Sequence, residues 1–187
     1  MLKAIFLWIY CMDFREVLLL LAAFTGLYYL AMAKLSRRRL WKPAVILLLL
    51  IWAASAAAQT VFQRTPDVFR QPVWEPFQSY ADALKAGGRI ELLRSNFMNT
   101  VFFYPAGVLL VSLLPEKWPF PVRLLIVLIL FTGLSLAIEL AQYHYHLGLA
   151  QTDDVIHNAL GAFIGAAVFL SAPKAIRAIR APQTDAD

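Results

Sequence analysis

The residues that could carry chemistry lie in one stretch of the chain, from Ile138 to Ala166. Between two long apolar runs, this stretch holds all three histidines together with glutamate, glutamine, aspartate and asparagine side chains. Carboxylates and imidazoles can transfer protons when burial shifts their pKa values. Together with amides, they can also bind a polar ligand. The stretch therefore predicts a polar site beside two apolar helices.

Two stripes of polar and small residues follow the three- and four-residue spacing of a helix. The first contains Thr132, Ser135, Glu139 and Gln142, and the second contains Asp154, Asn158, Gly161 and Gly165. Side chains at these steps lie on one side of a helix, and glycines four residues apart let another helix approach closely. We expect the two stripes to face each other as a packed pair of helices, with a polar pocket at one end.

Structural roles compete with functional ones at several of these positions. Gly161 and Gly165 are typical of helix packing. Either Asp153 or Asp154 could cap the second helix, because aspartate accepts main-chain N–H bonds at a helix N-terminus. The alternation of tyrosine and histidine over residues 143–146 is typical of a membrane interface rather than of a metal site.

Capping and topology explain neither Glu139 nor Gln142. These two residues are therefore the strongest candidates for a functional role. No spacing in the chain resembles a zinc motif such as H-E-x-x-H, so we expect no metal site and no cofactor.

The composition predicts a membrane protein. The chain has 187 residues, of which 60% are hydrophobic and 16% charged, and its mean hydropathy is +0.63. A soluble domain is about 45–50% apolar and about 25% charged. Five segments approach the length of about 20 apolar residues that a membrane-spanning helix needs. They are Phe14–Ala33, Pro43–Val61, Asn96–Leu114, Val122–Ala141 and Asp154–Ala172.

The fold class expected from these segments is all-α, a polytopic membrane bundle with about five transmembrane helices. Residues 14–172 form the bundle, with a loop over residues 62–95, and residues 173–187 form a basic tail. Residues 1–13 predict a short interfacial helix, because no small-residue cleavage site of a signal peptide follows them. Whether this segment spans the membrane, lies on it or is cleaved stays open. Cys11 is the only cysteine, so no disulfide forms within the chain.

The distribution of charge predicts the orientation in the membrane. The net charge is +5, and short basic segments occur at residues 34–42, 117–123 and 174–180. These segments follow the first, third and fifth spans, so they lie on the same side of the membrane. The positive-inside rule predicts that this side is the cytoplasm. The loop over residues 62–95 has nearly balanced charges and falls on the outer side. No basic patch interleaved with stacking aromatics occurs, so nucleic acid is not an expected partner.

The candidate site residues share a depth near the outer interface. Glu139 lies about 26 Å along the span that starts at Val122, in a hydrocarbon core about 30 Å thick. Acidic side chains at such positions normally face the protein interior or water. The residues expected to bind a ligand are Glu139, Gln142, Asp154, Asn158, Asn99 and His157.

These motifs resemble the VanZ-like family of small bacterial membrane proteins. The family signature has a Glu and a Gln three residues apart, as in "ELAQ" (Glu139 to Gln142). After a short loop it continues with Asp-x-x-x-Asn-x-x-Gly, as in "DVIHNALG" (Asp154 to Gly161).

The resemblance extends upstream and covers roughly Trp41 to Val168. "PVWEPFQSY" (Pro72 to Tyr80) is similar to the family's extracytoplasmic segment. "NTVFFYPAG" (Asn99 to Gly107) is similar to its third span, in which Pro105 and Gly107 would serve packing. One departure is that the family's loop arginine falls on or near Gly148, and its extra acidic residue on Gln151.

The resemblance implies a multi-pass protein of the bacterial cytoplasmic membrane, whose namesake confers low-level resistance to teicoplanin, a lipid-bearing glycopeptide. One hypothesis is a non-enzymatic protein of the cell envelope. It would bind or shield a lipid-bearing ligand at the outer leaflet, with Trp74, Pro76 and Phe77 as an apolar lip. Expected partners are membrane lipids or that ligand, and the sequence leaves homo-oligomers open.

The alternative hypothesis is an intramembrane enzyme that acts on a lipid-linked envelope substrate. Glu139 would be its general base, with His157 or Asp154 as the partner or as a metal ligand. A transporter is a third, weaker hypothesis, because no internal repeat is visible.

Overall fold

A computed structural model describes residues 14–35, 40–62, 71–87 and 93–171. The predicted interfacial segment, residues 1–13, and the basic tail, residues 173–187, lie outside these described residues. The Gly148 loop lies within them, as do the five predicted spans apart from Ala172, the last residue of the fifth. The end of the bundle that carries loop 62–95 is called the outer end below, following the orientation predicted from charge.

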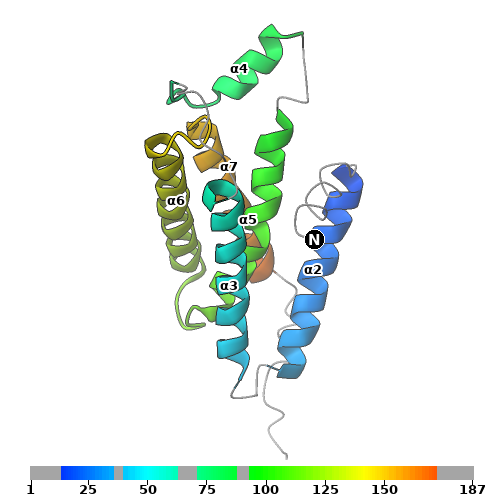
Figure 1. The fold of residues 1–187 in the computed structure, drawn as a ribbon. Helices are drawn as coiled ribbons and strands as arrows, with labels where there is room; N and C mark the ends of the chain where they lie inside the picture. The colour runs from blue at the N-terminus through cyan, green and yellow to red at the C-terminus, as the bar shows by residue number, and fades with distance from the viewer. Residues whose placement is uncertain (1–13, 36–39, 63–70, 88–92, 172–187) are drawn as a thin grey trace, which may run out of the picture.

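The described chain is all-α, as predicted, and forms an elongated bundle (Figure 1). Within the described residues, five helices are long and apolar enough to cross a membrane. They are α2 (Phe14–Leu35), α3 (Trp41–Ala57) with its extension to Phe62, α5 (Arg94–Leu113), α6 (Phe120–His144) and α7 (Thr152–Ser171). Each begins and ends within a few residues of its predicted span. A π-helix, η1 (Ala58–Phe62), extends α3, and a short helix, α4 (Gln78–Lys85), lies across the outer end.

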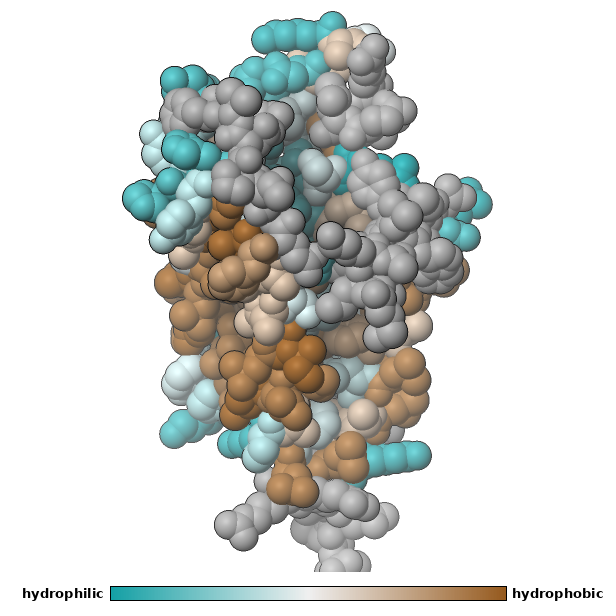
Figure 2. All heavy atoms as spheres, in the orientation of Figure 1, coloured by the Kyte–Doolittle hydropathy of each residue, from teal (hydrophilic) through white to brown (hydrophobic). Residues whose placement is uncertain are grey.

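The surface matches a bilayer environment. In Figure 2, hydrophobic residues form a band at mid-height, between hydrophilic residues at the two ends of the bundle. Leucines of the membrane-spanning helices, such as Leu19, Leu30 and Leu47, are exposed. In water such a surface would be costly, whereas in hydrocarbon it is the expected exterior. The distribution of hydropathy therefore supports a multi-pass membrane protein.

Helices α5 and α7 form the centre of the bundle, because three glycines bring their backbones into contact. A Cβ atom added to Gly161 would lie 2.1 Å from the carbonyl oxygen of Thr100, and one added to Gly165 would lie 2.1 Å from the carbonyl oxygen of Tyr104. At Gly107 it would lie 1.9 Å from the Ala162 carbonyl oxygen. Only glycine permits this approach, which maximises van der Waals contact where the surrounding lipid offers no hydrophobic driving force.

The sequence-based expectation for the glycine stripe was therefore wrong about its partner. Gly161 and Gly165 face α5 rather than the Glu139 stripe of α6. Asn158, from the same stripe of α7, does reach α6, where it donates to the Ser135 hydroxyl at 2.7 Å. Periodicity defines a helix face, but α7 is enclosed by two neighbours, so one face is shared between them.

Arg123 closes the opposite end of this core. The sequence predicts it as one of the cytoplasmic topology charges, but its guanidinium is buried and donates to the Val111 carbonyl oxygen of α5 at 2.7 Å. The last four carbonyl groups of a helix lack partners within the helix. Arg123 therefore also caps α5 and joins it to α6.

Candidate binding site at the outer end

The outer end is covered by residues 72–85, named the outer cap here. Main-chain hydrogen bonds join it to the start of α7: the Val73 N–H donates to Ala150 at 2.9 Å, and Val73 accepts from the Thr152 N–H at 3.0 Å. The Thr152 hydroxyl also donates to the Trp74 carbonyl oxygen at 3.0 Å. The cap is thus held at a defined position over the bundle rather than being tethered only by its loops.

Asp153 fastens the cap. Its buried carboxylate accepts from the main-chain N–H groups of Phe77 at 2.5 Å and Ser79 at 2.9 Å, and from the Ser79 hydroxyl. Phe77 precedes α4 with a φ of 63° and provides no side-chain cap. A carboxylate bound to the first N–H groups of a helix also complements its dipole. Asp153 therefore caps α4, not its own helix as the sequence suggested.

Asn96 extends this network to α5. Its side-chain amide is buried and donates to the Ser79 hydroxyl at 2.7 Å, so that Ser79 links Asp153 to Asn96. Asn96 was not among the predicted site residues, because nothing local distinguishes it from Asn99, three residues later. Its burial, and the identity of its partner, depend on where the cap lies.

His157 is held between the cap and its own helix. Nδ1 lies 2.6 Å from the Asp153 carbonyl oxygen and Nε2 lies 2.7 Å from the Tyr80 hydroxyl. A carbonyl oxygen only accepts, so Nδ1 donates a proton to Asp153, and Nε2 shares a second hydrogen bond with the Tyr80 hydroxyl. The two rings also stack, with centroids 5.8 Å apart. Both nitrogens are engaged with these two groups, so the structure does not pair His157 with Glu139, which was one option of the alternative, enzymatic hypothesis.

Glu139 and Gln142 are both buried in the interior of the bundle. The Glu139 side chain is only 2% exposed, and its carboxylate accepts from the Gln151 N–H at 2.9 Å. The Gln142 amide donates to the Thr60 carbonyl oxygen at 3.0 Å. Thr60 belongs to the π-helix η1, a helix type that occurs frequently at functional sites. The two residues of the "ELAQ" motif thus anchor the α6–α7 loop and the outer end of α3.

Asp154 and Asn99 form the part of the site nearest the surface. The Asn99 amide donates to the Asp154 carboxylate at 2.7 Å, and both side chains are partly exposed. The predicted ligand-binding residues therefore meet at one height but in separate contacts. Asn99 and Asp154 join α5 to α7, whereas Asn158 joins α7 to α6.

Three buried amide oxygens in the described part of the chain lack a hydrogen-bond partner, namely Asn96 Oδ1, Gln142 Oε1 and Asn158 Oδ1. An unsatisfied buried polar group costs about 1–3 kcal/mol. Buried water normally satisfies such groups, and a ligand that displaces it must supply hydrogen-bond donors. All three atoms are acceptors, so each can be satisfied only by a hydrogen-bond donor.

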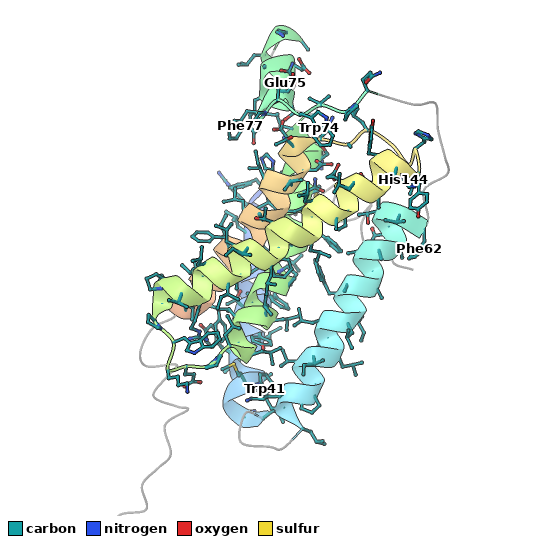
Figure 3. All side chains as sticks on the ribbon, turned by 90° about the vertical axis from the view of Figure 1, so that its left-hand side faces the viewer. Trp41, Phe62, Trp74, Glu75, Phe77 and His144 are labelled. Carbon is teal, nitrogen blue, oxygen red and sulfur yellow. The ribbon has the colours of Figure 1, made fainter. Side chains whose placement is uncertain are left out.

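Aromatic side chains surround the cap and form what is named the aromatic collar: Trp74, Phe77, Tyr80 and Tyr143. Trp74 is 46% exposed and Phe77 is 57% exposed. Figure 3 shows both at the base of α4, close to the outer end of α7. The Trp74 ring contacts the Tyr143 ring, with centroids 6.3 Å apart. Aromatic residues at this depth are typical of the boundary between lipid and water.

The loop between α6 and α7 shows no sign of a metal site. Among the described residues, no group of three or more His, Cys, Asp or Glu side chains could hold a metal ion. His144 is exposed at the end of α6 (Figure 3) and packs edge-on against Tyr145. Gly148 has a φ of 139°, a backbone conformation that favours glycine. An arginine at this position would therefore need a different loop.

Comparison with known proteins identifies one family. The family model described as VanZ/LLP1 matches residues 43–173, which include η1, the outer cap and helices α5 to α7. Every element that contributes to the polar site thus lies inside the matched region. No curated protein and no solved structure matches the chain. The chain is a multi-pass membrane protein that belongs to the VanZ/LLP1 family.

Proposed function

We propose that this protein is a non-enzymatic protein of the bacterial cytoplasmic membrane that binds or shields a lipid-bearing ligand at the outer leaflet. The observation that carries the proposal is the aromatic collar, which is exposed directly over buried polar residues. Each aromatic residue of the cap is hydrogen-bonded to a residue in the first two turns of α7. Trp74 is bonded to Thr152, Phe77 to Asp153 and Tyr80 to His157. An exposed apolar patch with a polar surround is typical of a binding surface.

The collar and the polar residues suit the two halves of such a ligand. Trp74 and Phe77 would contact the lipid portion, because their rings are exposed at the lipid–water boundary. The partly exposed Asn99–Asp154 pair would contact the polar portion, since it is the polar contact nearest the surface. Glu139, Gln142 and Asn158 are buried inside the bundle and hold the helices that carry this surface.

Teicoplanin combines a lipid chain with a polar glycopeptide, so it fits this division. We therefore include low-level glycopeptide resistance in the proposed function. Resistance would follow if the protein held such a molecule at the outer leaflet and kept it from its target. The lipid chain should be required, because the collar offers an apolar surface.

The test is the double variant Trp74→Ala/Phe77→Ala in cells that express the protein. Burying one large apolar side chain contributes about 1.5–3 kcal/mol, so binding of a lipid-bearing ligand should weaken at least about tenfold. Teicoplanin resistance should fall accordingly, while sensitivity to a glycopeptide without a lipid chain should not change. The matched control is Leu84→Ala, because Leu84 is 77% exposed on the same cap but lies outside the collar.

The variant removes side chains only, so the main-chain and Asp153 bonds of the cap should survive. Membrane insertion and elution as a single species in detergent would confirm that it folds. If a folded Trp74→Ala/Phe77→Ala protein conferred the same resistance and retained the same ligands as Leu84→Ala, the collar would not be the binding surface.

A second candidate function, an enzyme acting on a lipid-linked envelope substrate, rests on the burial of Glu139. A buried acid within a membrane span is a functional candidate by default. Glu139→Gln separates the two functions, because a glutamine oxygen can still accept the Gln151 N–H bond but cannot serve as a general base. For a binding protein we expect resistance and ligand retention to persist. For an enzyme, turnover of a lipid-linked precursor would be lost while its binding remained.

A further inference from the structure

Helix α2 contacts the rest of the bundle at two levels and leaves a cavity between them. Near its outer end, the Phe14 and Phe97 rings lie 5.5 Å apart. Further along, the Thr25 hydroxyl lies 2.8 Å from the Tyr104 hydroxyl, and the Tyr29 ring stacks on Phe169 at 4.8 Å. The position of α2 is therefore defined on both sides of the gap.

The cavity has a volume of about 300 Å³ and lies between α2, α3 and α5. Its walls include Leu20, Leu21 and Phe24 of α2, Trp52 of α3, and Met98 and Pro105 of α5. Nearly all of this surface is apolar. The Trp52 indole donates to the Phe102 carbonyl oxygen at 3.0 Å, so the one polar group of this side chain is satisfied. The lining offers almost no polar surface to bind water or a polar ligand.

The cavity lies in the outer half of the membrane. Met98 and Pro105 are about 6–17 Å from the start of α5, at 1.5 Å per residue. Leu20 and Phe24 lie at a matching depth, about 9–15 Å from the start of α2. One leaflet of the hydrocarbon core is about half of its 30 Å thickness. The cavity thus spans the depth that the acyl chain of one outer-leaflet lipid occupies.

Positive charge lies at the outer end of the cavity. Arg94 is in the first turn of α5, four residues before Met98 and so on the same side of that helix. Arg15 is in the first turn of α2. Glu16 follows Arg15, so these three side chains leave a net positive charge of one. Arginine binds phosphate with two parallel N–H bonds, and the first turn of a helix also favours an anion.

We propose that this cavity binds one acyl chain of an anionic phospholipid from the outer leaflet, with its phosphate against Arg94 and Arg15. The site is separate from the aromatic collar. Met98 lines the cavity, whereas the next residue, Asn99, binds Asp154 on α7. The lipid would fill the space between α2 and the central helices and so form part of the folded bundle.

The test is native mass spectrometry of the full-length protein, released from bilayers of phosphatidylglycerol and phosphatidylethanolamine in equal amounts. Wild type should retain one phospholipid, predominantly phosphatidylglycerol. Leu20→Trp should lose it at least tenfold, because the larger ring fills the cavity from its lipid-facing side. The matched control is Leu19→Trp, since Leu19 is 70% exposed and does not line the cavity.

Arg94→Gln tests the headgroup without altering the cavity. The variant should keep one bound lipid, but its preference for phosphatidylglycerol over phosphatidylethanolamine should fall about tenfold. The control is Lys85→Gln, because Lys85 is exposed on α4. Equal retention in Leu20→Trp and Leu19→Trp would overturn the chain site. An unchanged preference in Arg94→Gln would overturn the assignment of an anionic headgroup. Trp74→Ala/Phe77→Ala should retain the phospholipid, so failure of the proposed function and failure of this site are distinguishable.

Discussion

Gly161→Ala should destabilise the bundle by about 3 kcal/mol, near the upper end of the usual range for overpacking a core. The added Cβ would lie 2.1 Å from the Thr100 carbonyl oxygen. This atom belongs to the backbone of α5, so no side-chain rotation can relieve the overlap. The two helices would have to separate along a contact that Gly165 and Gly107 also maintain. We expect a large fall in the melting temperature in detergent.

The matched control for this prediction is Gly133→Ala on α6. A Cβ there meets no atom within 4 Å, and alanine is the better helix former. Its melting temperature should equal or exceed that of wild type. If Gly161→Ala and Gly133→Ala had the same melting temperature, the close contact between α5 and α7 would not exist in the membrane.

Asp153→Ala should release the outer cap from the bundle. The substitution removes the acceptor of three hydrogen bonds and leaves the N–H groups of Phe77 and Ser79 unpaired. Hydrogen bonds to a charged group contribute about 1.5–3 kcal/mol each. A loss of about 3 kcal/mol in local stability corresponds to roughly hundredfold faster amide exchange in the segment that opens. Hydrogen exchange of the cap peptide, residues 72–85, measures this directly.

Asp82→Ala is the control for the cap, because Asp82 lies on α4 itself. Its exposed carboxylate is 3.9 Å from the Lys85 ammonium, and such surface pairs contribute about 0–1 kcal/mol. Exchange in Asp82→Ala should therefore stay close to that of wild type. Equal exchange rates in Asp153→Ala and Asp82→Ala would show that the remaining contacts of the cap, among them the main-chain pairing of Val73, hold it without Asp153.

The contacts of Glu139 and Gln142 also change the interpretation of the family motif. The "ELAQ" and Asp-x-x-x-Asn residues suggest a ligand pocket, yet several of them bind the protein's own backbone. Glu139 binds the Gln151 N–H, and Gln142 binds the Thr60 carbonyl oxygen. In a membrane the backbone of a loop must be satisfied by the protein where water is scarce. The motif therefore builds the outer surface, and Asn99 and Asp154 remain the members closest to a ligand.

The sequence by itself determined the five spans, because a membrane helix needs an apolar run of a length set by the bilayer. It also determined the common depth of Glu139, Asp154 and Asn99, since helical rise converts position into height. Neither inference required knowledge of any neighbour. Both depend on the local order of residues along one helix.

Only the tertiary structure decided which groups meet. The glycines of α7 pack on α5, Asp153 caps a helix that begins more than 70 residues earlier in the chain, and Arg123 caps α5 from α6. The spacing of residues defines a face but not its partner, and a hydrogen bond between distant segments has no local signal. The cavity between α2, α3 and α5 is of the same kind, because a void exists only between packed elements. Close packing and long-range hydrogen bonds are properties of the assembled bundle.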